Sequence, residues 1–467
     1  ADGKGREYYI DYVMNRSSIR QWSLTRLAEY GFDSKTGIWA ECPGYSSVVI
    51  NDYANFVNQF DNNLRYDLVK AMPVLSKAVA TTPQYLFPNR MICGFGDTHP
   101  GYLNTNFFVR MIQNAQANGK KEQEDYFTAL LKCLNPGAGN EKAEKKNVRV
   151  SVNSFFEDKP LTLNPEVQAG KIEEYVSPLF HAPNVSWLVQ RNGMDPRSSL
   201  MISQNGSEGN HMHANGISME LYGKGYVLGP DAGIGLSLYS GLDYAEYYSQ
   251  FPSHNTVCVD GISSYPVMKS NHSFELLSCF PASAEPGGEF TSVTYSNLYF
   301  REPESRADQT RMMGIVTTAP ETGYYVDVFR SRKEKGGDKM HDYFYHNLGQ
   351  TLTLTAADGT DLNLQPTEEL AFAGAHLYAY SYLYDKKVAA TGKDVKATFT
   401  IDMKDKGGDD ISMNLWMKGE PDREVFTALS PMTEGLSRTP GMPYNIKEQP
   451  TLTFVARQHG EAWNRPF

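Results

Sequence analysis

The chain has 467 residues, of which 40% are hydrophobic and 12% are aromatic, and its formal net charge at pH 7 is -10. This length exceeds the roughly 250–300 residues at which a single hydrophobic core usually divides, so we expect two or more domains. The acidic balance argues against nucleic-acid or anionic-membrane partners, which require broad basic surfaces, and the sequence contains no run of about 18 apolar residues to span a bilayer.

Apolar residues recur at intervals of three and four in the first 150 residues, which predicts antiparallel helices. One stripe runs from Tyr45 to Phe60, and Gly and Pro residues separate the stripes. The other stripes are Ile19, Trp22, Leu27 and Tyr30; Phe107, Phe108, Met111, Ile112 and Ala115; and Tyr126, Phe127, Leu130 and Leu131. We therefore expect a helical domain over residues 1–150.

From about residue 148 the pattern changes to short alternating or β-branched runs separated by glycine turns. Such runs are typical of a sandwich of stacked antiparallel sheets. We expect a β-sandwich over residues 151–385 and a smaller β module over residues 386–467. The predicted fold class is α+β, with helices first and sheets second.

The densest group of chemistry-bearing residues lies near the middle of the chain. His211-Met212-His213 is followed by Asp231 in a Gly-Pro-Asp-Ala-Gly turn and by His254 in Ser-His-Asn-Thr-Val. Neighbouring strands can bring His213, Asp231 and His254 together, and two imidazoles with one carboxylate suit zinc. In an extended chain His211 shares a face with His213, so it can point into a cleft while His213 binds metal. The alternative is a chance His-x-His pair, because the chain has ten histidines.

This run resembles the central β-domain of the heparinase II/III-like polysaccharide lyases, in which His-x-His, an apolar strand, Asp-x-Gly and His-Asn-Thr-Val follow in that order. The resemblance implies that His211 is a catalytic histidine and that His213, Asp231 and His254 hold zinc. It also places Tyr239 near an active-site tyrosine of some relatives. In that family an (α/α) toroid precedes a multilayer antiparallel β-sandwich, and the substrate groove lies between them.

A second stretch, from Gly37 to Ser46, resembles the toroid segment in which a Gly, a Glu and then a catalytic Tyr introduce a helix. The resemblance makes Tyr45 a candidate catalytic group and Glu41 an orienting or substrate-binding carboxylate. The ordinary alternative is that Tyr45 simply begins its helix stripe. Relatives also carry an upstream Asn or His that neutralises the substrate carboxylate, and Asn15 does not lie in a similar setting. We therefore expect the toroid to be partial and the chain to be a portion of a longer enzyme, unless this subfamily uses another residue.

Three further side chains are candidates for contact with an acidic substrate. Arg191 and Arg197 lie at the entrance to the predicted β-domain, and an arginine aimed at a developing enolate would stabilise its charge. His99 lies in a glycine-containing loop, for which a capped loop before a helix is the alternative interpretation.

The resemblance implies a polysaccharide lyase that cleaves a uronate-containing polysaccharide by β-elimination. A base removes the C5 proton and an acid protonates the departing O4. His211 is the more natural base and a tyrosine the more natural acid, because their ordinary pKa values are near 6.5 and 10; the epimer of the uronate decides between them. The zinc is expected to be structural, because it fixes the strand that aims His211.

Two other functions are left open by the residues. One is a non-catalytic glycan-binding protein, and the other is a glycan hydrolase in which the metal activates water. A secreted or periplasmic protein is expected, with any export signal already removed, since the first residues lack the charged-then-apolar order of a signal peptide. The oligomeric state is not fixed by the sequence, and a homodimer is left open.

Overall fold

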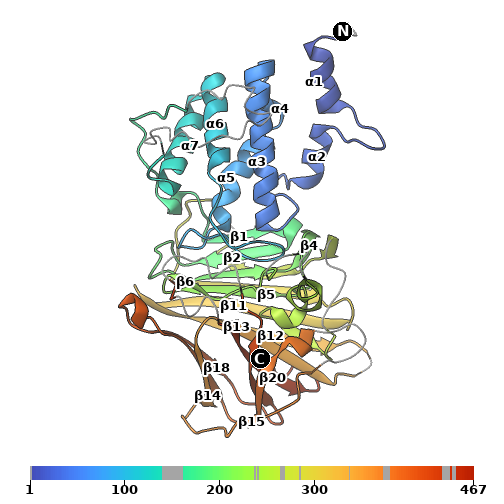
Figure 1. Ribbon diagram of the computed structural model, residues 1–467, viewed down its shortest axis with the longest axis vertical. Coiled ribbons are helices and arrows are strands. Elements are labelled where there is room, and N and C mark those ends of the chain that lie inside the picture. The colour runs from blue at the N-terminus through green and yellow to red at the C-terminus, as the bar shows by residue number, and fades with distance from the viewer. Residues whose placement is uncertain are drawn as a thin grey trace.

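The computed structural model describes residues 3–138, 161–235, 238, 241–262, 269–282, 285–335, 337–371, 379–433, 442–443 and 449–467. A helical part lies at one end of the long axis and stacked sheets occupy the rest (Figure 1). The predicted order, helices and then an antiparallel multilayer β-sandwich, is confirmed. Among the described helices, none is both long and apolar enough to cross a membrane.

The helical part is held together by apolar faces that meet between the helices. The α-helices are α1 (Arg6–Asn15), α2 (Leu24–Gly31), α3 (Pro43–Gln59), α4 (Leu68–Ala71), α5 (Val74–Thr81), α6 (Asn106–Ala117) and α7 (Lys121–Leu134). Helix α3 packs on α6 through residues such as Val57 and Met111, and α6 packs on α7. Proline at the first position of α3 suits a helix start, because its missing N–H would have no partner there.

The predicted stripe that includes Ile19 and Trp22 is wrong in its first half. Helix α2 begins only at Leu24, because the Ser23 side chain accepts a hydrogen bond from the Arg26 N–H and caps the helix. Ile19 lies before this cap and is fully exposed.

The sheet nearest the helices is buried on both faces. Its strands are β1 (Leu179–Ala182), β2 (Trp187–Arg191), β3 (Met201–Asn205), β5 (Ser218–Gly223) and β6 (Tyr226–Gly229), in the order β1-β2-β3-β5-β6. All five residues of β2 and of β3 are buried. This sheet is therefore an inner layer between the helical part and the remaining sheets (Figure 1).

Three larger antiparallel groups and one short pair complete the β part. A four-stranded sheet has the order β12 (Thr322–Lys333), β11 (Ala307–Ala319), β10 (Val293–Arg301), β9 (Glu275–Phe280). A six-stranded sheet has the order β15 (Gln365–Pro366), β16 (Tyr384–Ala390), β19 (Glu424–Ser430), β20 (Thr451–His459), β13 (Met340–Asn347), β7 (Val257–Val259). A three-stranded sheet joins β14 (Thr351–Ala356), β17 (Val395–Ile401) and β18 (Ile411–Met417), and β4 (Ser207–Asn210) pairs with β8 (Lys269–His272).

The expected boundary at residue 386 does not separate two sheets. Strand β13 pairs with β20 along its whole length and also with β7, so strands from both sides of the boundary share one sheet. Their side chains also share one core, in which Val257, Phe344 and Val455 are buried together. The C-terminal strands are thus part of the sandwich. The expected boundary between residues 150 and 151 lies outside the described residues.

Candidate active site and metal centre

A glycine-containing loop from the helical part, Cys93–Thr98, carries a carboxylate into the β part. The Gly94 N–H donates to Glu220 Oε1 at 2.9 Å, and the Asp97 N–H donates to the His211 carbonyl at 2.9 Å. Gly96 has φ +63°, and a Cβ on it would lie 2.5 Å from the His211 oxygen. Glycine is therefore required where this loop crosses His211.

The Asp97 carboxylate bridges two histidines. Its Oδ2 lies 2.9 Å from His211 Nδ1 and its Oδ1 lies 2.9 Å from His213 Nε2. The Tyr244 hydroxyl donates to Oδ1 at 2.6 Å, and burial and the nearby Asp97 charge raise the pKa of Tyr244. Burial raises the pKa of Asp97, but the hydrogen bonds and charges of its partners outweigh burial and hold the pKa below its ordinary value. Asp97 is therefore an ionised acceptor at neutral pH.

His211 lies against Tyr45 at the junction of the helical and β parts. The two rings are stacked, with 3.6 Å between their centroids and 7° between their planes. Tyr45 occupies the first turn of α3, and this turn is anchored to the Asp97 loop because the Gly44 N–H donates to Thr98 Oγ1 at 3.1 Å. The His211 side chain is 26% exposed, whereas that of Asp97 is fully buried. The structure thus brings the two candidate catalytic groups together, with the imidazole open to solvent.

The expected extended backbone at His211 is wrong. Strand β4 ends at Asn210, and His211 adopts a left-handed conformation with φ +58°. This turn separates the two imidazoles, so that Asp97 lies between them and His213 faces the interior.

The three predicted metal ligands, His213, Asp231 and His254, come together in the interior. One ligand atom of each lies within 4.8 Å of the others, and all three residues are buried. His213 Nδ1 and His254 Nε2 are buried nitrogens without a hydrogen-bond partner among the described residues. Their other ring nitrogens face Asp97 and Asp231, the latter at 3.0 Å. Carboxylates that orient ligand histidines in this way are usual at zinc sites, so these residues fit the ion.

A second buried carboxylate, Glu220 on β5, lies close to this group. Burial raises the pKa of Glu220 to about 8, and the negative charge of Asp231 adds to the shift. Burial also raises the pKa of Asp231, but the charges of His254 and His213 and the hydrogen bond from His254 lower it below its ordinary value. At neutral pH Asp231 is therefore the ionised ligand, and Glu220 is mostly protonated while it anchors the Asp97 loop.

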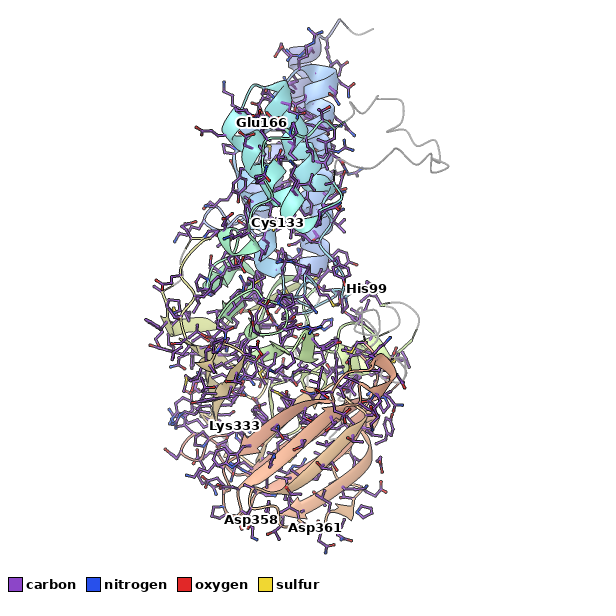
Figure 2. All side chains as sticks on the ribbon, turned by 90° about the vertical axis from the view of Figure 1, so that its left-hand side faces the viewer. His99, Cys133, Glu166, Lys333, Asp358 and Asp361 are labelled. Carbon is purple, nitrogen blue, oxygen red and sulfur yellow. The ribbon has the colours of Figure 1, made fainter. Side chains whose placement is uncertain are left out.

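Two of the expected substrate-binding residues lie beside the paired rings. Glu41 forms an isolated parallel bridge with Asn210, and burial raises its pKa while the charge of His211 and hydrogen bonds with Trp39 and Asn210 oppose the shift. His99 follows Asp97 by two residues and is exposed where the helices meet the sheets (Figure 2).

The two expected arginine contacts are not placed to meet a substrate at His211. Arg191 is fully buried, and its guanidinium donates to the carbonyls of Gln84 and Ser177 at 2.9 and 3.1 Å. It joins the helical part to β2 instead. Arg197 is exposed in the connection between β2 and β3, at the end of β3 away from the segment that leads to His211. Tyr239 lies outside the described residues.

Asp97, Tyr244 and Glu220 are the site residues that the sequence pattern missed. The loop that contains Asp97 was considered only for His99, yet an acid beside a glycine-rich turn was the available signal. The site that results has a partly exposed imidazole stacked on a phenol, with the group of His213, Asp231 and His254 behind them. Such a pair can remove one proton and deliver another.

Two family models match consecutive parts of the chain. The model described as "Endo-acting ulvan lyase 2nd domain" matches residues 35–175, and that described as "Heparinase II/III-like, C-terminal" matches residues 176–318. Residues 176–318 therefore form a heparinase II/III-like domain, preceded by a segment similar to the second domain of endo-acting ulvan lyases. The two matches meet just before β1, and the second contains His211, His213, His254, Asp231 and the inner sheet.

Named relatives agree with this assignment. An endo-acting ulvan lyase of Formosa agariphila is 26% identical over 507 residues, which cover 100% of this chain and 57% of the relative. A heparan sulfate lyase from Pedobacter heparinus has a TM-score of 0.52 at 11% identity, covering 93% of this chain and 52% of that one, and a mutant of it has a TM-score of 0.51. At such identity these two structures show the fold alone. The chain spans little more than half the length of these relatives.

Proposed function

We propose that this chain is the part of a polysaccharide lyase that carries its acid-base pair, and that it cleaves a uronate-containing polysaccharide by β-elimination. The observation that carries the proposal is the stacked pair of Tyr45 and His211, brought together from the helical and the β part. The pair lies at the junction where the family's substrate groove is expected, and the family match supports the same chemistry.

His211 is suited to act as the base. Its Nδ1 faces the ionised Asp97, so a proton on Nδ1 leaves the lone pair on Nε2 free to accept the C5 proton of a uronate. The electrons of that C–H bond form the C4=C5 double bond as the C4–O4 bond breaks. The Tyr45 hydroxyl is then placed to protonate the departing O4. With the epimer that presents its C5 hydrogen to the other side, the two residues exchange roles.

We also propose that zinc occupies the group formed by His213, Asp231 and His254. The support is two buried, unpartnered imidazole nitrogens beside an ionised carboxylate. When bound there, the ion supplies positive charge that balances Asp231 and ties β6 to β7, a structural role. The arrangement gives no separate support to a metal-assisted hydrolase.

The named relatives supply the polymers to test first. Ulvan is the first polymer to test, because one relative is named an endo-acting ulvan lyase, and heparan sulfate is the second. Both are acidic polysaccharides too large to enter a cell, so a secreted or periplasmic location is part of the proposal. A homodimer stays an open possibility, testable by the mass of the protein in solution.

The test uses the zinc-loaded protein and a panel of uronate polysaccharides. Elimination creates a conjugated double bond, so the expected result is a rise in ultraviolet absorbance together with new reducing ends. New reducing ends without absorbance would show a hydrolase instead. Tight binding of the polymers with neither signal would show a glycan-binding protein.

A further inference from the structure

We infer that Asp97 is a positioning residue that couples the cation centre to His211, because one carboxylate fixes which nitrogen each of the two histidines presents. The inference rests on the proposed function for the role of His211. Asp97 comes from the helical part, as Tyr45 does, whereas both histidines that it contacts belong to the β part.

The position of the Asp97 carboxylate between His211 and His213 determines the tautomer of each imidazole. An ionised carboxylate can only accept, so both imidazoles must donate to it, His211 through Nδ1 and His213 through Nε2. The lone pairs are then on the opposite nitrogens. That of His213 is on Nδ1, the buried nitrogen that has no hydrogen-bond partner among the described residues. That of His211 is on Nε2, on the partly exposed ring.

The bridge is rigid enough to transmit a change at one histidine to the other. Three hydrogen bonds fix the Asp97 loop, through Cys93, Gly94 and the Asp97 N–H, each at 2.9 Å. The Tyr244 hydroxyl donates to Asp97 Oδ1, the same oxygen that His213 Nε2 contacts. Because one carboxylate accepts from both rings, a shift of His213 on loss of a cation would move the group that orients His211.

Asp97→Asn is the discriminating variant, because the amide has the same shape but only one accepting oxygen. One of the two imidazoles must then face an NH2 group and invert its tautomer. We expect zinc affinity to fall about 10- to 100-fold, as for other partners of ligand histidines, with a fall in kcat and little change in KM. A Tyr244→Phe variant keeps the carboxylate and serves as the matched control, with a smaller loss of zinc affinity.

The coupling is measured without any polysaccharide. Zinc alone is titrated against a chromophoric chelator, and the rate at which diethyl pyrocarbonate modifies His211 is followed by mass spectrometry with and without zinc. In the wild-type protein, removing zinc should change this rate several-fold. In Asp97→Asn the rate should be the same in both conditions.

Wild-type zinc affinity in Asp97→Asn, or an unchanged dependence of the His211 rate on zinc, would overturn the inference. Thermal unfolding of the zinc-free proteins distinguishes coupling from a general loss of structure, because the two unfolding temperatures should agree. If the wild-type protein forms no unsaturated product, the proposed function fails while the zinc and labelling results still decide the role of Asp97.

Discussion

The ring of Tyr45 lies parallel to that of His211, 3.6 Å away between centroids, although one residue begins a helix and the other follows a strand. The contact places a phenol hydroxyl and an imidazole on one face of the junction. It also means that the two groups can be altered separately, since their backbones belong to different parts of the fold.

Replacing Tyr45 by Phe keeps the stacked ring and removes only the hydroxyl. We expect kcat for formation of unsaturated product to fall about 10²- to 10⁴-fold, the range for loss of a general acid or base. The thermal unfolding temperature should not change. Tyr384→Phe, an exposed tyrosine on β16, is the matched control and should keep full activity. Near wild-type activity in Tyr45→Phe would exclude Tyr45 as acid or base.

Replacing His211 by Ala should abolish elimination and leave bound zinc unchanged. The reason is that His211 is partly exposed and is not one of the three clustered ligands. Activity is followed by absorbance and zinc content by elemental analysis of the purified protein. Loss of zinc together with activity would show that His211 and His213 do not divide catalysis and metal binding between them.

Replacing His213 by Ala should remove zinc and its effect on stability together. A ligand that binds only the folded state stabilises it by about 2.7 kcal/mol at 100 times its Kd. The wild-type protein should therefore unfold at a lower temperature after chelation, and His213→Ala should show no such difference. A chelation effect that persists in the variant would place the ion elsewhere.

Replacing Arg191 by Met should destabilise the protein without a specific effect on substrate binding. The buried carbonyls of Gln84 and Ser177 lose their donor, and each unpaired buried acceptor costs about 1–3 kcal/mol, or roughly 2–6 kcal/mol for the two. Urea unfolding measures the change. Arg197→Met is the exposed control, with an expected change within about 0.5 kcal/mol. A stable Arg191→Met variant with a raised KM would instead support direct contact between Arg191 and the substrate.

His181 on β1 makes stability depend on pH. Burial lowers its pKa from 6.5 to about 4, so below pH 6.5 the unfolded chain binds a proton that the folded chain does not. The free energy of unfolding should fall between pH 6.5 and pH 4, by up to about 3 kcal/mol from this residue, since one pKa unit corresponds to about 1.4 kcal/mol. His181→Gln should lose less stability than wild type over this range. Parallel curves for the two proteins would contradict the prediction.

The sequence predicted the clustering of the three candidate metal ligands better than the arrangement around them. His213, Asp231 and His254 stand in a dense, ordered pattern beside strands, and the structure brings them together as expected. Asp97 could not be found in this way, because it reaches His213 across 116 positions and from the other part of the fold. The prediction for Arg191 was wrong because an arginine at the end of a strand is often free to contact a substrate. Here the segment that contains Gln84 covers the end of β2.

The pairing of strands in the six-stranded sheet was also harder to predict than the strands themselves. Alternating residues identify strands such as β17 and β20, but pairing between β13 and β20 is set by packing between distant segments. A boundary was therefore expected near residue 386, where the local composition changes but the sheet continues.

Strand β20 lies between β19 and β13, and β13 in turn pairs with β7, which begins three residues after His254. The sheet beside that histidine therefore cannot close until β20 has been synthesised. Deletion of a few dozen C-terminal residues would then abolish cation binding in a protein whose ligands were all retained.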